Sequence, residues 1–407
     1  MRLSDAALLD LVQARTLAYF RDHAHPVSAM ARERSGGAAS YDIAETVTTG
    51  GTGFGIMALI AGAERGFVPR AEVVARIATI TDFLAAAPRY HGAFPHWMNG
   101  TTGATIAFSP RDDGGDIVET AFLMMGLLSA RQWLGADPLA ARIDALWRAV
   151  DWAAFCPARE RMMWHRGAQD DWAVGLPITG YHEGLIAFVL ALASPSHPID
   201  PAAYEIGWKS SRSYFNGREF YGIRLPLGPD FGGPLFFTHY SFMGLDPRGL
   251  ADRNVDYFEQ NRAHALIHHA YAQDNPKGFA GYGPAWGLTA CDCEGGYDAF
   301  SPTNDRGVIA PTAAIASLPY TPEQSLAALR HYHEDLGDRL WGPYGFRDAF
   351  NETTGWVSTS HLAIDQGPIV VMVENARSGL LWRLFMSCPE IATALAKMGM
   401  TRVPHIA

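Results

Sequence analysis

A repeated pattern of polar clusters, each followed by a stretch that is apolar on every side, constrains the fold of this chain more than any other feature. The clusters are rich in Gly, Thr, Asp and His, and their starts lie roughly 55–70 residues apart. A helix that is apolar on all sides, as predicted over 121–128 and 185–192, must be buried on all sides. The clusters occupy 48–53, 112–116, 179–183, 238–241, 304–307 and 361–367.

A second set of stretches, between the clusters, is apolar on one face only, as surface helices are. These stretches are 8–20, 73–84, 138–155, 200–216, 252–273 and 322–336. Pairing each buried inner helix with a half-exposed outer helix predicts an all-α (α/α)6 toroid of six inner and six outer helices. In such a ring, each helical hairpin packs on its neighbours and buries the apolar surface that a single hairpin would leave exposed. An irregular helical domain is the alternative, and no run of alternating residues predicts strands.

The predicted ring makes a single catalytic domain of residues 1–407, although the length alone is compatible with two or three domains. Long loops rich in Gly, Pro and aromatic residues precede the inner helices, so we expect them on one face of the ring, where function usually lies. The loops cover 88–115, 156–180, 216–237, 274–306 and 342–366. The glycines of 51–55 lack the Lys and the strand of a phosphate loop, and they indicate close backbone packing at a helix start.

The composition excludes several classes of partner. A net charge of −10 argues against a nucleic-acid binder, and no apolar run approaches the ~20 residues of a membrane span. Four cysteines are too few for a disulfide scaffold, and we predict free thiols. The N-terminal residues show no signal-peptide core, so we predict a cytoplasmic protein as the sequence stands, and a periplasmic one if a leader has been removed. The sequence carries no signal for oligomeric state.

Carboxylates stand at three of the six inner helix starts. Asp116 and Glu119 are spaced to share a helix face at the second start, Glu183 is at the third and Asp365 is at the sixth. An isolated Asp at such a position is usually a helix cap. If the starts surround one mouth, however, these acids face one cavity, and paired carboxylates there suit glycoside hydrolysis.

Aromatic and polar residues in the same loops and helix starts supply candidate sugar contacts, because aromatic rings present flat apolar faces to sugar rings. His264 and His268 have a metal-compatible spacing but no accompanying acid, and the thiols of Cys291 and Cys293 lack a second pair. We therefore expect no metal and no cofactor. The candidate substrate-binding residues are Asp112, Glu119, His96, Trp97, Arg111, Trp164, Trp172, Tyr181, His182, His239, Tyr282, Trp286 and Asp305.

Several runs of this chain resemble those of the glycoamylase-like bacterial proteins of glycoside hydrolase family 144, whose characterised members act on β-1,2-glucans. The runs are 48–55, 92–97, 108–120, 178–183, 226–237, 286–290 and 363–368. The resemblance implies an (α/α)6 toroid that cuts β-1,2-linked glucose chains without a metal. It implies that Glu183 is an essential acid, that Asp112, Asp116 and Glu119 serve activity or substrate binding, and that Asp365 matches a position used as base. His182, where many relatives have Asn, and Cys291-Asp292-Cys293 depart from the pattern.

The sequence therefore predicts a glycosidase for β-1,2-glucan or its oligosaccharides, with Glu183 as general acid, Asp365 as base and Asp116 as the alternate base. Proton transfer through a water or a sugar hydroxyl is compatible with this assignment. The alternatives are a transglycosylase, a hydrolase of a related cyclic or branched β-glucan, and a non-catalytic glucan-binding protein. Endo or exo cleavage, and inversion or retention, stay open at this stage because both depend on loop and carboxylate geometry.

Overall fold

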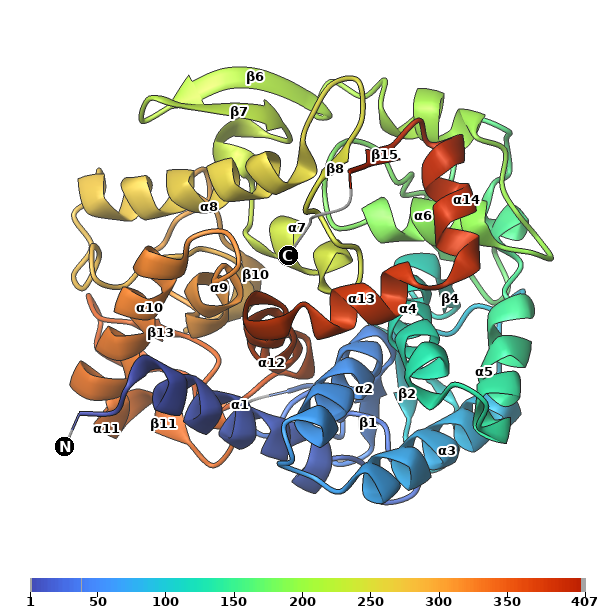
Figure 1. Cartoon of the computed structure of the whole chain (residues 1–407), viewed down its shortest axis with the longest axis horizontal. Coiled ribbons are helices and arrows are strands. Elements are labelled where there is room, and N and C mark those ends of the chain that lie inside the picture. The colour runs from blue at the N-terminus through green and yellow to red at the C-terminus, as the bar shows by residue number, and fades with distance from the viewer. Residues whose placement is uncertain (1, 38, 404–407) are drawn as a thin grey trace.

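The computed structural model describes residues 2–37 and 39–403 and shows a molecule built mainly from helices (Figure 1). It is 46% helical, which agrees with the predominance of helix expected from sequence. The α-helices are α1 (Asp5–Asp22), α2 (Thr49–Glu64), α3 (Arg70–Ala86), α4 (Ile117–Leu134), α5 (Pro138–Arg148), α6 (Leu185–Ala193), α7 (Phe236–His239), α8 (Tyr257–Asp274), α9 (Pro311–Ala316), α10 (Pro322–Arg330), α11 (Gly337–Leu340), α12 (Ala363–Ser378), α13 (Leu380–Met386) and α14 (Pro389–Lys397). Shorter 3-10 and π turns are η1 (Trp152–Phe155), η2 (Ala203–Trp208), η3 (Asp230–Gly232), η4 (Ser241–Met243) and η5 (His331–Asp335).

The helices that follow the polar clusters form the centre of the molecule. α2 packs against α4 and α12, α4 also packs against α6, and α12 against α9. The glycines of α2 explain how closely two of these helices approach. A methyl group at Gly53 would lie 2.2 Å from the carbonyl oxygen of Phe122 in α4, and one at Gly126 would lie 2.2 Å from the carbonyl oxygen of Gly53. Only glycine leaves room for this contact.

The one-faced helices lie around the centre, with α3, α5, α8 and α10 at the rim in Figure 1. α1 packs on α12 and α2, α3 on α2, α5 on α4, α10 on α9 and α14 on α6. One large cluster of buried apolar side chains runs from Leu8 to Met400. A smaller cluster of Phe220, Leu225 and Ile267 holds the β6–β7 hairpin against α8.

Some outer stretches differ from the predicted helices. The stretch 200–216 contains only the π turn η2 and the start of β6, and α5 ends at Arg148 instead of continuing to 155. α8 has ten buried residues. Two of them, His264 and His268, contact the carbonyl oxygen of Gly233, at 3.0 and 2.8 Å. The two imidazoles thus fill a packing role.

The expectation of no strands is wrong, because the loops fold into small antiparallel sheets of two or three strands. Most of these strands have only two to four residues, which is too short to produce a readable alternation. They are β1 (Thr46–Thr48), β2 (Trp97–Asn99), β3 (Thr105–Ile106), β4 (Gly115–Asp116), β5 (His165–Arg166), β6 (Phe215–Phe220), β7 (Ile223–Leu227), β8 (Leu250–Ala251), β9 (Ala290–Cys293), β10 (Gly296–Ala299), β11 (Trp341–Gly342), β12 (Gly345–Phe346), β13 (Phe350–Asn351), β14 (Trp356–Val357) and β15 (Thr401–Arg402).

Two further expectations concern thiols and membranes. All four cysteines are free, as predicted. Within residues 2–37 and 39–403, no helix combines the length and the apolar character that crossing a lipid bilayer requires.

Candidate active site

A cavity of about 1060 Å³ opens among the loops that precede the central helices. Its volume is at the upper end of the ~300–1,000 Å³ range of ligand pockets, so it offers space for more than one sugar ring. Of the residues predicted from sequence, Glu119, Glu183, His96, Trp97 and Trp164 line it.

Glu183 is held at the cavity by its own backbone. Its carbonyl oxygen accepts the Ser241 hydroxyl at 2.6 Å, and that hydroxyl oxygen accepts the N–H of Ile186 at the start of α6. Oε2 of Glu183 is buried and has no hydrogen-bond donor in the described residues. It lies 3.2 Å from Nδ1 of His182, but this nitrogen accepts the N–H of Gly184. Only the O–H of a protonated Glu183 would make the contact a hydrogen bond.

Asp116 is the N-cap of α4 and anchors a group of residues that we call the histidine cluster (His96, Asp112, Asp116 and Glu119). Oδ1 of Asp116 accepts the N–H groups of Val118 and Glu119, both at 2.9 Å. Its Oδ2 accepts Nε1–H of Trp164 at 3.1 Å and lies 3.4 Å from Nδ1 of His96. Both oxygens of Asp116 are therefore engaged within the protein.

The charges in the histidine cluster shift one another. Burial lowers the pKa of His96, but Glu119 and Asp116 raise it more, to about 9. Burial raises the pKa of Glu119 to about 7, with Asp116 adding to the rise while His96 and the N–H of Gly50 oppose it. Glu119 thus changes charge near neutral pH while lining the cavity, as a proton-transferring group should.

Asp112 is the most exposed of the three acids in the same cluster. Its Oδ1 is 3.2 Å from Nε2 of His165, which accepts the N–H of Gly114. His96, Asp112 and Asp116 bring possible metal-ligand atoms within 4.8 Å of one another. Against the effect of burial, Glu119 and Asp116 raise the pKa of His96 to about 9, so a protonated imidazole can supply positive charge among these acids.

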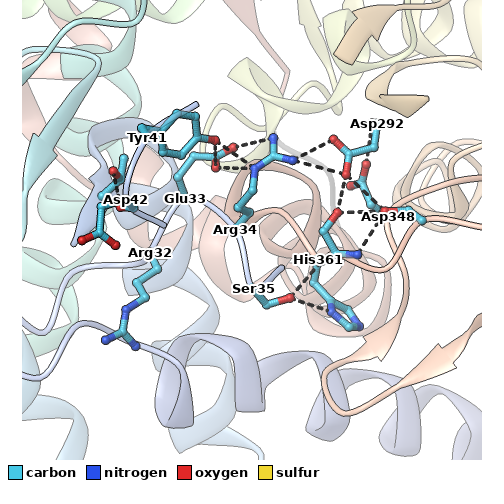
Figure 2. Close-up of polar contacts among 12 residues, drawn as sticks. Arg32, Glu33, Arg34, Ser35, Tyr41, Asp42, Asp292, Asp348 and His361 are labelled. Atoms are coloured by element: carbon cyan, nitrogen blue, oxygen red, sulfur yellow. Dashed lines mark hydrogen bonds and ion pairs between the residues drawn. The ribbon is translucent and has the colours of Figure 1, made fainter. Parts of the chain in front are cut away.

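A second charged group borders the cavity, which we call the arginine cluster (Glu33, Arg34, Asp292, Asp348 and Asp365). Figure 2 shows Arg34 between two acids. Its Nε donates to Glu33 at 2.7 Å and its Nη1 donates to Asp292 at 3.1 Å. The hydroxyl of Tyr41 also donates to Glu33. These bonds join the segment between α1 and β1 to the β9–β10 hairpin across one wall of the cavity.

Asp365 lies behind the cavity wall rather than on it. Its neighbour Ile364 and Leu362 line the cavity, while Asp365 is 2% exposed. It sits in the first turn of α12 and caps no N–H group, so it is not the helix cap that its position suggested. Burial raises the pKa of Asp365 well above its ordinary value, and the carboxyl of Asp348 raises it further.

Aromatic rings connect the two clusters along the wall. The ring of Tyr41 lies 4.5 Å from that of Trp97, centre to centre, and Trp97 lies 4.9 Å from Phe108. Phe108 in turn stacks on His96 at 4.1 Å. Trp164, Tyr297 and Trp356 also line the cavity. Such a surface is suited to the apolar faces of sugar rings.

Several predicted substrate-binding residues do not line the cavity. Their side chains serve internal contacts instead: Arg111 binds the carbonyl of Ala173, Trp172 lies under Arg166, Tyr181 packs on Tyr214, His182 stacks on Trp164, His239 contacts Ser317, Tyr282 bonds to Asp305, and Trp286 is buried.

Sequence reasoning missed Glu33, Arg34, Tyr41, Asp348 and Tyr297. The first three lie between the first outer and first inner helix, where no periodic pattern exists to place them. Figure 2 shows that partners from distant parts of the chain position them. Cys291-Asp292-Cys293 departs from the family pattern, and Asp292 and Cys293 line the cavity.

Comparisons with known proteins agree on the kind of protein that carries this cavity. Residues 175–389 match the sequence profile of a family described as Putative glucoamylase. A putative glucoamylase from Bacteroides uniformis is 52% identical, with 99% of each chain covered and a TM-score of 0.96. An endo-beta-1,2-glucanase from Chitinophaga pinensis, in complex with sophorotriose and glucose, is 46% identical over 98% of this chain and 99% of that chain, with a TM-score of 0.95.

A curated relative is longer than this chain. The exo beta-1,2-glucooligosaccharide sophorohydrolase (non-reducing end) of Parabacteroides distasonis is 42% identical over 424 residues. The match covers 97% of this chain and 58% of that protein, so this chain spans little more than half the length of that relative.

Proposed function

This chain belongs to the putative glucoamylase family, and from that premise we propose that it hydrolyses β-1,2-glucan or β-1,2-gluco-oligosaccharides with its own carboxyl groups. The relatives named above also bear out the resemblance to glycoside hydrolase family 144. One observation carries the proposal: Glu183 lines a sugar-sized cavity, with one side of its carboxyl group against His182 and 13% of its side chain exposed.

Glu183 is the proposed general acid. Oε2 of Glu183 is buried against His182, so the other carboxyl oxygen, Oε1, is the one that can donate a hydrogen bond to the glycosidic oxygen of a bound glucan. A proton passed along that bond turns the leaving oxygen into a hydroxyl group. The backbone bonds through Ser241 keep the carboxyl in place, as a proton donor requires.

Asp365 is the proposed base, acting through an intervening hydroxyl because it lies behind the wall. Tyr240 lines the cavity, and its hydroxyl has no hydrogen-bond partner in the described residues. Burial raises the pKa of Tyr240, and Asp365 and Glu183 are among the charges that raise it further. A water or a sugar hydroxyl can therefore relay a proton from the cavity to Asp365, with the phenol of Tyr240 available to hydrogen-bond that group. Asp116 is a poorer base, because the α4 cap and Trp164 occupy its oxygens.

The wall residues are proposed to bind the sugars. Trp97, Phe108 and Trp164 offer ring faces, and His96 and Glu119 offer polar atoms between them. No group outside the chain is needed for these roles.

We also infer that the chain forms one (α/α)6 domain. The contacts run in the order α9, α12, α2, α4 and α6. α7 and η4 complete the circle, since Ser241 bonds to Ile186 of α6 and His239 contacts Ser317 at the end of α9. The continuous apolar core from Leu8 to Met400 supports a single unit.

The decisive experiment replaces Glu183 by Gln and follows reducing ends and product sizes on linear and cyclic β-1,2-glucans. We expect kcat to fall about 100- to 10,000-fold, the usual contribution of a general acid, with sugar binding and fold retained. Glu259→Gln, on the exposed side of α8, is the control and keeps full activity.

The same assay separates the alternatives. Larger products than the substrate would identify a transglycosylase. A wild-type protein that binds β-1,2-glucan without releasing reducing ends would be a binding protein. An unchanged rate in Glu183→Gln would remove this residue from the reaction.

A further inference from the structure

Two carboxyl groups meet behind the cavity wall. Asp348, in the turn between β12 and β13, and Asp365, in the first turn of α12, are each 2% exposed. Their carboxyl groups lie within hydrogen-bonding contact of each other. Segments seventeen residues apart in sequence thus place two acids side by side away from bulk solvent.

The pair has almost no other partner. Neither oxygen of Asp365 has a donor in the described residues, and neither has Oδ1 of Asp348. Oδ2 of Asp348 accepts the backbone N–H of Asp292 at 2.7 Å. Two ionised carboxylates in contact repel each other strongly, so a buried pair of this kind holds a proton.

Among the described residues, the one cation that acts on the pair is already bonded to other acids. The titratable groups that face the pair are Asp292, Glu33, Arg34, Tyr19, Tyr240, Tyr297 and Cys291. Arg34 is the one cation among these facing groups, and its guanidinium is bonded to Glu33 and Asp292 (Figure 2). The arginine cluster contains four carboxyl groups and one Arg, an imbalance of charge that a proton held by Asp348 and Asp365 reduces.

We propose that Asp348 and Asp365 hold one proton between them and accept the second as a unit, with Asp348 carrying the negative charge and Asp365 passing the proton to it. The N–H of Asp292 favours the charge on Asp348, because a hydrogen bond to the ionised form stabilises that form. This inference rests on the proposed hydrolysis and adds a second carboxyl to its base.

The proton balance closes over one turnover. The oxygen of the attacking water bonds to C1, and the water loses a proton through the intervening hydroxyl to Asp365, whose own O–H proton passes to Asp348. The bond between C1 and the leaving oxygen breaks, and that oxygen takes the proton of Glu183. The pair then holds two protons and Glu183 none, and transfer of one proton from the pair to Glu183 through solvent restores the start.

Burial supports a base that works near neutral pH. It raises the pKa of Asp348 to about 7, with Asp292 adding to the rise and the N–H of Asp292 and Arg34 opposing it. A base whose pKa lies near the working pH combines a usable ionised fraction with a strong drive to take the proton.

The test uses Asp348→Asn and Asp365→Asn, with Asp246→Asn as the matched control. Asp246 is also buried and bonded, to Arg248 and Arg402, but it does not line the cavity. We expect kcat on β-1,2-glucan to fall at least about 100-fold in both pair variants, with KM nearly unchanged, and to stay at wild-type level in Asp246→Asn. Asparagine at 348 mimics a neutral hydrogen-bond donor. Wild-type kcat in Asp348→Asn would therefore show that Asp365 works alone and would overturn the proposal.

A second readout needs no substrate and separates this inference from the proposed function. Infrared spectra of the free enzyme detect the C=O stretch of a protonated carboxyl group. We expect this band to persist to higher pH in the wild type than in either single variant, because the last proton leaves two charges in contact. If the band disappears at the same pH in all three proteins, the two carboxyl groups do not share a proton and the proposal is overturned. The proposal is also overturned if the band appears only after treatment with EDTA, because a metal cation then bridges the two carboxylates. Should Asp348→Asn not fold, Asp365→Asn alone decides the infrared comparison.

Discussion

The histidine and arginine clusters border one cavity but neutralise their acids differently. In the histidine cluster, the positive charge is an imidazole that titrates, with a pKa raised to about 9 by Glu119 and Asp116 against the effect of burial. In the arginine cluster, the positive charge is a guanidinium, which stays ionised at every working pH. The net charge of the histidine cluster can therefore change through its imidazole and through its carboxyl groups. The net charge of the arginine cluster can change only through its carboxyl groups.

The difference matters because each cluster serves another task. Trp97 and Phe108 stack near His96, so the histidine cluster lies where sugar rings are expected. The arginine cluster ties together segments that are more than 250 residues apart, through the bond from Arg34 to Asp292. A permanently charged guanidinium suits an ion pair that holds two segments together. An imidazole that titrates suits a surface that exchanges protons with substrate.

The largest effect is expected from removing the fixed charge. Arg34→Met leaves Glu33 and Asp292 buried without a cation, and loss of one partner of a buried ion pair usually costs ~3–5 kcal/mol. Urea unfolding at pH 7 measures this free energy. Arg34→Lys is the control and loses less, because it keeps the charge but not the two-sided geometry. If Arg34→Met lowers the unfolding free energy by less than about 1 kcal/mol, the ion pairs of Arg34 contribute little to stability.

A smaller and pH-dependent effect is expected from His96→Asn. The folded-state pKa of His96 is raised from 6.5 to about 9, so the folded protein binds this proton more tightly than the unfolded chain does. The stabilisation is fully present below pH 6.5 and disappears as the pH rises through 9. Its size is about 3 kcal/mol, from the shift at about 1.4 kcal/mol per pKa unit.

The measurement is the difference in unfolding free energy between wild type and His96→Asn at several pH values. The difference should be constant below pH 6.5 and shrink between pH 6.5 and 9. The difference between wild type and Arg34→Met should change much less over the same interval. Parallel curves for the two variants would erase the distinction between a titrating and a fixed cation.

The two clusters also differ in how far the sequence could predict them. Asp116 and Glu119 follow a glycine turn and begin a strongly apolar helix, so local rules place them at a helix start. Glu183 is likewise recognisable as the acid that heads an apolar helix. Local signals of this kind account for the central helices and for half of the site.

The arginine cluster could not be predicted in this way. Arg34 meets Asp292 through a contact across 258 positions, and neither residue lies in a periodic stretch. For Asp365, in contrast, a local sequence signal existed but predicted the wrong exposure. Its position before an apolar run suggested an acid facing the mouth, but Asp365 is 2% exposed, and its neighbours Leu362 and Ile364 line the cavity instead. The small strands of the loops carry no readable pattern, because two residues cannot show a period.

The smallest effect is expected at Tyr41, where the two clusters meet. Its hydroxyl donates to Glu33 and its ring lies against Trp97. Tyr41→Phe removes the hydrogen bond but keeps the ring, so we expect a loss of about 1 kcal/mol in stability and an unchanged KM for β-1,2-gluco-oligosaccharides. Tyr41→Ala removes both, and should raise KM as well, because Trp97 loses the ring that holds its orientation. A raised KM already in Tyr41→Phe would mean that the hydroxyl contacts the sugar, which would assign this part of the arginine cluster to substrate binding instead of structure.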